Sequence, residues 1–318
     1  MGISQANFGD EIFKQQSGRA LTGVKQGGCP NSVSFLSDKV LAGGVSPPAS
    51  ALRLTNSGYP DRLQGFTLVE LVIVMIGILM LILMLLPAVQ QVRETARRQA
   101  CQNNLLQIGI AIGNYESSFL HLPPGCINDN GPVTYNSQGR DISFLVLLQP
   151  YLERNFVFEQ FDFAAGSYAV ENDKFNQKSP PFLQCPSTYQ DYVNYAGCHH
   201  HQEDPIDVDN LGLLFLNSKI RHQQILDGRS NTILLGEKTG GHLRNWMSGT
   251  GETLRNTSYI SKKGAFQLSN QLYVGGFNSL HPGGVNFCFA DGSIHTLSRD
   301  IDPTLFQNLG HRADGVMY

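Results

Sequence analysis

The dominant feature of the hydropathy pattern is one long apolar segment between residues 66 and 88. From Leu71 to Leu86 the chain carries no charge, and Gly77 is the only residue there without an apolar side chain. A helix needs about 20 mostly apolar residues to cross a bilayer, so the pattern predicts a transmembrane helix over 66–88. The acid Glu70 lies near its start, where a carboxylate in lipid costs about 2.5 kcal/mol or more. We therefore expect Glu70 to have a charged partner or a specific role.

Beyond Pro87 the pattern becomes amphipathic while the helical period continues. Apolar residues recur mostly every three or four positions, as in a helix with one buried face, at Val89, Val92, Ala96, Leu105, Ile108, Ile112 and Tyr115. We expect one helix over 66–118, kinked or loosened at Pro87, whose amphipathic half, 89–122, packs on a globular domain. Gly109 and Gly113 are poor helix formers, at about 1 kcal/mol each, and are expected to admit a close neighbour.

Residues 123–318 alternate between short apolar runs and turn signals, which predicts a globular β-rich domain. Val285, Phe287 and Phe289 share one face of an alternating run, and the Asp291-Gly292 pair after it is typical of a type I′ hairpin turn. Other short elements are predicted as strands at 211–216, 232–235, 272–274 and 293–298, and as helices at 142–151 and 302–311. The predicted fold class is α+β, with a long N-terminal helix packed on a C-terminal antiparallel β-sheet.

The first 64 residues have no sustained hydrophobic period and are rich in Gly, Ser and Pro, which predicts a disordered segment. Met1 is the only methionine before Met75, so two interpretations of residues 1–65 stay open. They form either a long cytoplasmic leader that is removed, or an extension upstream of a later start near Leu52, Leu54 or Leu63.

The composition and the motifs exclude several classes of function. Of the 318 residues 41% are hydrophobic and only 15% are charged, against roughly 25% charged residues in ordinary globular proteins. The formal net charge of −3 excludes the basic footprint of a nucleic-acid-binding protein. No P-loop, Rossmann fingerprint or nucleophile elbow occurs in the sequence. The sequence therefore predicts no nucleic-acid partner and no enzymatic activity of these classes.

Two stretches carry residue types that bind metals, and both favour a structural interpretation. The run Cys198–His201 offers sulfur and imidazole ligands, but neighbouring residues of a strand point to opposite faces, so we expect an exposed loop. The carboxylates around Pro205 lack the EF-hand spacing, so a solvated loop is expected. The sequence predicts no cofactor and leaves calcium as the weaker alternative, with weak candidate metal ligands at Asp204, Asp207, Asp209, His199 and His201.

The segment Gly-Phe-Thr-Leu-Val-Glu, residues 65–70, stands directly against the apolar run. It resembles the processing site of type IV prepilins and type II secretion pseudopilins. The resemblance implies that a prepilin peptidase cuts after Gly65 and that the new N-terminal amine of Phe66 is methylated. It also implies that Glu70 neutralises the amine of Phe66 on a neighbouring subunit, since two charges that are costly in lipid become tolerable as a pair. Pro87 falls where many pilin helices carry a proline. An ordinary membrane anchor with a coincidental flank is the alternative.

A second resemblance lies near the C-terminus, where His281 is followed, after nine residues, by Asp291 and Gly292. The pattern is similar to the C-terminal signature of a large bacterial family of prepilin-like proteins of unknown biochemical role. Further stretches agree with it, at 97–105, 122–125, 185–187 and 227–233, so the resemblance covers residues 65–318. His281, Asp291 and Gly292 are interpreted as structural residues that fix the hairpin and its docking.

The same resemblance bears on the cysteines. Cys101 and Cys185 both lie in the stretches that agree with the family, so it implies a disulfide between them if the domain is exported. Cys29 lies before the proposed cleavage point and would be lost.

Together the resemblances imply a structural subunit of a type IV pilus-like or type II secretion pseudopilus-like filament, with a pilin-like fold. The implied partners are the prepilin peptidase and N-methyltransferase, other pilin-like subunits, the inner-membrane assembly machinery and membrane lipid. The implied location is the inner (cytoplasmic) membrane, crossed once, with the C-terminal domain outside the cytoplasm in a periplasmic or extracellular filament.

One observation opposes the implied orientation, and two alternative functions stay open. Arg93, Arg97 and Arg98 follow the apolar segment, and the positive-inside rule would place that flank in the cytoplasm. A non-polymerising, single-pass exported binding domain is the first alternative. An enzyme centred on His281, Asp291 and the histidine run is the second.

Overall fold

The structure is a computed structural model that describes residues 65–134, 139–176, 179–188, 193–240, 245–261 and 270–316. The predicted leader, residues 1–64, lies outside the described residues. The chain divides into two units between Leu81 and Ile82.

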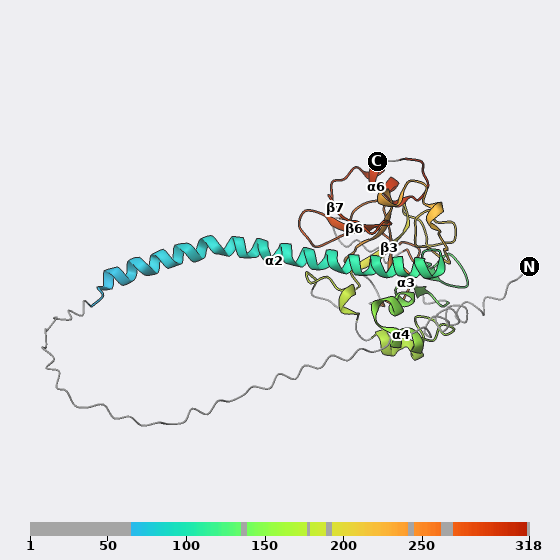
Figure 1. Cartoon of the computed structure of the whole chain (residues 1–318), viewed down its shortest axis with the longest axis horizontal. Helices are drawn as coiled ribbons and strands as arrows, with labels where there is room; N and C mark the ends of the chain where they lie inside the picture. The colour runs from blue at the N-terminus through green and yellow to red at the C-terminus, as the bar shows by residue number, and fades with distance from the viewer. Residues whose placement is uncertain are drawn as a thin grey trace, which may run out of the picture. The chain divides into compact units, whose positions relative to one another are not determined.

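The described part of the chain combines helices with short strands (Figure 1). The α-helices are α2 (Leu68–Phe119), α3 (Phe144–Leu147), α4 (Asn155–Gln160), α5 (Asp173–Asn176) and α6 (Pro303–Gly310). The 3-10 helices are η2 (Gln149–Leu152), η3 (Val170–Asn172), η4 (Pro181–Leu183), η5 (His222–Gln224) and η6 (Arg229–Asn231). The strands are β1 (Cys126–Ile127), β2 (Ile142–Ser143), β3 (Tyr195–His200), β4 (Ile233–Glu237), β5 (Leu254–Asn256), β6 (Val285–Phe289) and β7 (Ile294–Leu297).

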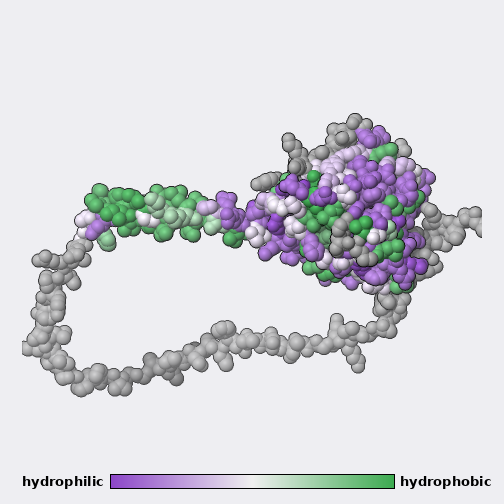
Figure 2. All heavy atoms as spheres, turned by 90° about the horizontal axis from the view of Figure 1, so that it is seen from above, coloured by the Kyte–Doolittle hydropathy of each residue, from purple (hydrophilic) through white to green (hydrophobic). Residues whose placement is uncertain are grey.

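Helix α2 is one element of 52 residues that continues through Pro87, in agreement with the helix predicted over 66–118. A capping box starts it: the Thr67 amide and hydroxyl donate to Glu70 Oε2 at 2.9 and 3.0 Å, and the Glu70 amide donates to Thr67 Oγ1 at 3.3 Å. Its apolar side chains from Leu68 to Leu86 are exposed, and they form the largely hydrophobic surface of Figure 2. Within the described residues, α2 is the one helix long and apolar enough to cross a membrane.

The second half of α2 packs against the domain along one stripe. Its buried residues follow the helical period at Cys101, Leu105, Ile108, Ala111, Ile112 and Tyr115. Val89 and Val92, which we predicted on the buried face, are 46% and 68% exposed. The fully buried stripe of α2 therefore begins at Cys101, and the domain contacts made before it, from Glu94 onward, are polar.

The main sheet has five strands in the order β5-β3-β4-β6-β7. Neighbouring strands are antiparallel except at one edge, where β5 runs parallel to β3. The predicted antiparallel sheet is confirmed for the pairs β3–β4, β4–β6 and β6–β7, and the β3–β5 pair departs from it because the chain crosses back past β3 after β4. β1 and β2 form a separate two-stranded antiparallel ladder.

The two faces of the sheet have different chemistry. One face is an apolar core in which Phe287 lies between Phe277 and Phe306 of α6, with ring centroids 5.2 and 5.6 Å apart. The predicted shared face of Val285, Phe287 and Phe289 is confirmed there. The intervening residues of β6, Asn286 and Cys288, meet α2 instead. A polar sequence position therefore does not mark a solvent-facing position in this sheet.

Several predicted elements differ from the structure. Cys198–His201 is not an exposed loop: its first three residues belong to β3, which is buried along its whole length. Residues 211–216 and 272–274 are not strands; the first segment contributes only a single bridge, from Leu216 to Cys126. Residues 142–151 form β2, α3 and the start of η2 rather than one helix. The closing helix is confirmed as α6, which Asp302 caps through a bond from the Leu305 amide.

The β6–β7 hairpin is confirmed, but its turn is not type I′. Only Gly292 has a positive φ, of 89°, whereas a type I′ turn needs positive φ at both central residues. The Gly292 amide donates to the Phe289 carbonyl, and the Asp291 carboxylate accepts from the Ser293 amide and hydroxyl. The connection is therefore a three-residue loop, in which Asp291 can keep a negative φ.

Gly109 and Gly113 lie one turn apart on α2 but in different surroundings. A Cβ added at Gly109 would lie 2.9 Å from Cys288 Sγ of β6, whereas one at Gly113 would meet nothing within 4 Å. The close approach that we predicted is therefore confirmed for Gly109 and is wrong for Gly113.

This difference predicts opposite effects of one substitution. Gly113→Ala should raise the free energy of unfolding by up to about 1 kcal/mol, because alanine is the better helix former. Gly109→Ala should lower the stability, because the clash with Cys288 outweighs that gain. Thermal unfolding of the two full-length variants in detergent tests this. Equal stabilisation by both substitutions would contradict the close contact between α2 and β6.

Candidate functional site

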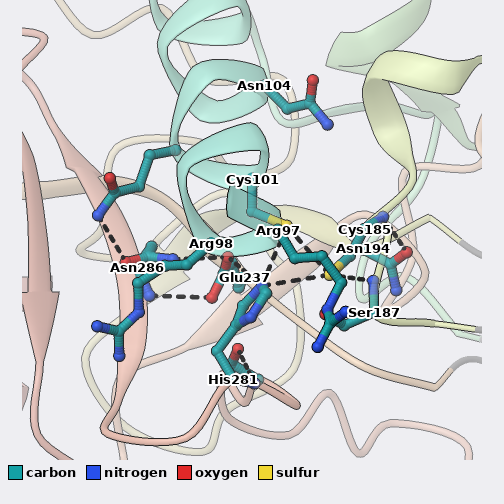
Figure 3. Close-up of polar contacts among 12 residues, drawn as sticks. Arg97, Arg98, Cys101, Asn104, Cys185, Ser187, Asn194, Glu237, His281 and Asn286 are labelled. Carbon is teal, nitrogen blue, oxygen red and sulfur yellow. Dashed lines mark hydrogen bonds and ion pairs between the residues drawn. The ribbon is translucent and has the colours of Figure 1, made fainter. Parts of the chain in front are cut away.

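Three segments that are far apart in the sequence bring two cysteines and a histidine together beside α2 (Figure 3). Cys101 lies on α2, Cys185 follows η4, and His281 lies in the loop before β6. All three are buried, with exposures of 0%, 6% and 0%. We call Cys101, Cys185 and His281 the cysteine–histidine cluster.

The potential ligand atoms of the cluster form a nearly equilateral triangle. Cys101 Sγ lies 3.0 Å from Cys185 Sγ, and His281 Nε2 lies 3.1 Å from Cys101 Sγ and 3.4 Å from Cys185 Sγ. Cys101 and Cys185 are both free cysteines in the structure. A disulfide bond between them would hold the two sulfurs about 2.0 Å apart. The structure therefore brings together the two cysteines that the family resemblance pairs, and the disulfide itself stays a prediction.

The opposite side of the imidazole ring is held by a carboxylate. Glu94 Oε1 lies 2.7 Å from His281 Nδ1, and Glu94 Oε2 accepts from Arg97 Nε at 2.9 Å. Because a carboxylate accepts hydrogen bonds, this contact places a proton on Nδ1 and directs Nε2 toward the two sulfurs. The Arg299 guanidinium donates to the His281 carbonyl at 2.8 Å, so the backbone of this residue is anchored as well.

A second, more deeply buried carboxylate adjoins the cluster. Glu237 at the end of β4 accepts from the Asn286 side chain at 2.9 Å and from the Asn286 amide at 3.1 Å. Its Oε1 lies 3.8 Å from His281 Nε2. Glu237 and Asn286 belong to neighbouring strands, so the sheet itself holds this acid in place.

Hydrogen bonds decide where charge resides among these buried groups. The bond from the Cys101 thiol lowers the pKa of the Cys185 thiol despite burial, and His281 adds to that effect. The same bond and burial raise the pKa of Cys101. Burial by itself lowers the pKa of His281, but Cys185 and Glu94 outweigh it and raise this pKa to about 9. These contacts therefore favour the charged form of His281 and make Cys185 the more acidic of the two thiols.

The stretch 97–105 of α2, which agrees with the family resemblance, is the surface that docks the helix. Arg98 donates to the Pro282 carbonyl at 2.6 Å, and Gln102 donates to Asn286 Oδ1 at 3.2 Å. Asn104 donates to the Gln184 carbonyl and to the Tyr195 hydroxyl, both at 3.1 Å. These contacts fix the rotation of α2, and therefore the direction in which Cys101 points.

The other predicted site residues lie elsewhere. Gly65 and Phe66 begin the described part of the chain, and Phe66 is 87% exposed. Glu70 lies in the capping box, and Pro87 lies inside α2. Asp291 and Gly292 form the β6–β7 turn, whereas His281 contacts α2. The residues of the C-terminal motif therefore lie at two separate places in the fold. The roles predicted for these residues in processing and assembly stay predictions.

The weak metal candidates do not converge. His199 is fully buried, its Nδ1 lies 3.1 Å from Asn210 Oδ1, and burial lowers its pKa to about 3. The His201 ring packs against the rings of His200 and His311, tilted to the first and edge-on to the second. Asp204, Asp207 and Asp209 lie on the surface around Pro205, where burial and the neighbouring acids raise the pKa of Asp204. Within the described ranges, the groups with ligand atoms close enough for one ion are the cysteine–histidine cluster and a second group of Asp227, His311 and Asp314.

Sequence reasoning missed Glu94 and Glu237. Glu94 could have been found, because it precedes Cys101 by seven residues and two turns of a helix return a side chain to the same face. Glu237 could not, because its place beside His281 depends on the pairing of β4 with β6. The sequence also did not join His281 to the two cysteines, because they lie in three separate segments.

The fold and the cluster define an α+β protein in which one exposed apolar helix continues into a compact domain with a buried cysteine–histidine site. The family model described as "Protein of unknown function (DUF1559)" matches residues 90–304, and the chain belongs to this family. The match includes the whole cluster with Glu94 and Glu237, and it begins after Gly65, Phe66 and Glu70. No curated protein and no solved structure matches the chain.

Proposed function

We propose that the protein is a structural subunit of a type IV pilus-like or type II secretion pseudopilus-like filament. The observation that carries the proposal is the division of α2. Its first part exposes an apolar surface as long as a bilayer is thick, and its second part is packed on the domain. Such a helix can be stored in a membrane and can later pack with copies of itself, because both environments remove the apolar surface from water.

The processing steps follow from the Gly65–Glu70 segment. A prepilin peptidase cuts after Gly65, and an N-methyltransferase modifies the amine of Phe66. The helix then lies in the inner membrane with the domain outside the cytoplasm, until assembly machinery transfers it to a filament of pilin-like subunits. The cut would leave Thr67 and Glu70 together, so the capping box observed at the start of α2 is compatible with the mature chain.

The test is mass spectrometry of the N-terminus, on membrane fractions and on material sheared from the cell surface. We expect a terminal peptide that begins with N-methylated Phe66 in both fractions. An intact N-terminus upstream of Gly65 in mature protein would overturn the processing step. The arginines after the apolar segment argue against an orientation with the domain outside the cytoplasm. Protease accessibility of the domain in intact spheroplasts tests this orientation directly.

One observation favours the alternative of a non-polymerising membrane anchor that displays a binding domain. Glu70 already has local partners, since its Oε2 accepts both the amide and the hydroxyl of Thr67. The acid could therefore be retained only to start the helix. In that case the processed chain would occur in membranes and would be missing from sheared surface material.

A further inference from the structure

We propose that Cys101, Cys185 and His281 bind one transition-metal ion of the zinc class. This site is independent of the filament proposal, because none of its residues belongs to the processing segment. Three potential ligand atoms from three separate segments point to one place, within 4.8 Å of one another. A site assembled in this way would also fasten α2 to the loops before β3 and β6.

The ligand types select the class of metal. Two sulfurs and one imidazole nitrogen suit zinc or copper(I), whereas calcium and magnesium require oxygen ligands. Two thiolates would balance the charge of a divalent ion, and any proton displaced from a thiol or from His281 Nε2 on binding would pass to solvent. Glu237 Oε1, at 3.8 Å from His281 Nε2, is an oxygen within reach of a fourth position.

The geometry suits such an ion. Zinc binds sulfur at about 2.3 Å and nitrogen at about 2.0–2.1 Å, so over a triangle of edges 3.0, 3.1 and 3.4 Å it would lie roughly 1 Å above the plane. Small rotations of the two cysteine side chains would bring the sulfurs to the wider spacing of a tetrahedral site.

The support around His281 distinguishes a metal site from a simple cysteine pair. A disulfide needs nothing from an imidazole, yet His281 is fully buried and presents Nε2 to both sulfurs. Its Nδ1 is held by Glu94, which is the arrangement by which a carboxylate orients a metal-binding histidine. Arg97 in turn holds Glu94.

A surface hollow lies beside the Glu94 carboxylate that holds His281. This open hollow is lined by Gln90, Gln91, Glu94, Thr95, Arg98 and Pro282. Glu94 therefore lines the hollow and also contacts His281, so it is shared by this hollow and the surroundings of the cluster.

The first experiment is a cobalt(II) titration of the full chain, purified in detergent, reduced and stripped of metal. We expect one ion per chain and the charge-transfer absorption of thiolate-bound cobalt, which zinc should then bleach. Cys101→Ser, Cys185→Ser and His281→Ala should each weaken binding at least about 100-fold, and Glu94→Gln should weaken it about 10–100-fold with the stoichiometry retained. Cys126→Ser and Cys198→Ser are the matched controls, since both remove a buried cysteine outside the cluster.

A second measurement needs no variant. X-ray absorption at the zinc edge of the unmutated, zinc-loaded chain should show two sulfur neighbours and at least one nitrogen. Oxygen and nitrogen neighbours alone would overturn the proposal, as would equal loss of cobalt binding in the control variants. A Cys101–Cys185 disulfide in protein isolated without reductant would overturn it in favour of the covalent pair.

Discussion

A chain carrying Glu70→Ala is expected to remain in the membrane fraction and to disappear from sheared surface material. In the proposed filament the carboxylate neutralises the amine of Phe66 on the next subunit, and an unpaired charge inside a bundle of apolar helices is costly. The apolar segment itself is unchanged, so membrane insertion should persist. Immunoblots of the membrane and sheared fractions would measure both quantities.

The capping box supplies the controls for this prediction. Glu70→Gln keeps an oxygen that can accept from Thr67 but removes the charge, so it should fail to assemble as Glu70→Ala does. Thr67→Ala removes the hydroxyl bond to Glu70 Oε2 but keeps the acid, so it should still assemble. If Glu70→Gln assembles normally, Glu70 acts only in starting the helix, and the charge-pairing role is refuted.

Replacing Asp141 with asparagine should stabilise the protein at pH 8 and leave its stability near pH 4 almost unchanged. Asp141 is 1% exposed; its Oδ1 accepts from Asn128, and its Oδ2 has no hydrogen-bond partner among the described residues. Burial raises the pKa of this carboxyl from 3.8 to about 7. Asp141 also has a positive φ, of 41°, which asparagine tolerates well.

The direction of this pH dependence follows from whether the folded or the unfolded chain holds the Asp141 proton. Between about pH 4 and pH 7 the unfolded chain has lost the Asp141 proton while the folded chain keeps it, so rising pH favours unfolding. Above pH 7 the folded protein carries the full cost of a buried carboxylate, on the order of 2–4 kcal/mol.

The measurement is thermal or denaturant unfolding of the full chain in detergent from pH 4 to pH 8. The difference between Asp141→Asn and the parent should grow across this range and then level off. Asp129→Asn is the matched control, because Asp129 is an exposed acid paired with Arg140. A constant difference between Asp141→Asn and the parent at every pH would contradict the prediction.

The relation between sequence and structure differs from element to element. Helix α2 was predictable because its signals are local: an apolar run of spanning length followed by a helical stripe. The β6–β7 hairpin was also predictable, from the alternation of Val285, Phe287 and Phe289 before an Asp-Gly pair. β3 was not, because it is buried along its length and its sequence, Tyr-Ala-Gly-Cys-His-His, therefore shows no alternation of apolar and polar residues.

The same division holds for the cluster. The motif stretches marked Cys101, Cys185 and His281 as separate points of interest without assigning them to one site. Their convergence depends on the rotation of α2 on the sheet, which Gln102 and Asn104 fix through contacts with residues more than 80 positions away. Such contacts leave no periodic signal in the chain.

By itself, the sequence determined the long helix, its exposed apolar half and the family resemblance, because hydrophobic period and short motifs are properties of neighbouring residues. Only the tertiary structure decided that β5 runs parallel to β3, that His199 and His200 are buried, and that two cysteines and a histidine share one site. These features depend on which face of one element meets another, and that is settled when the whole domain packs together.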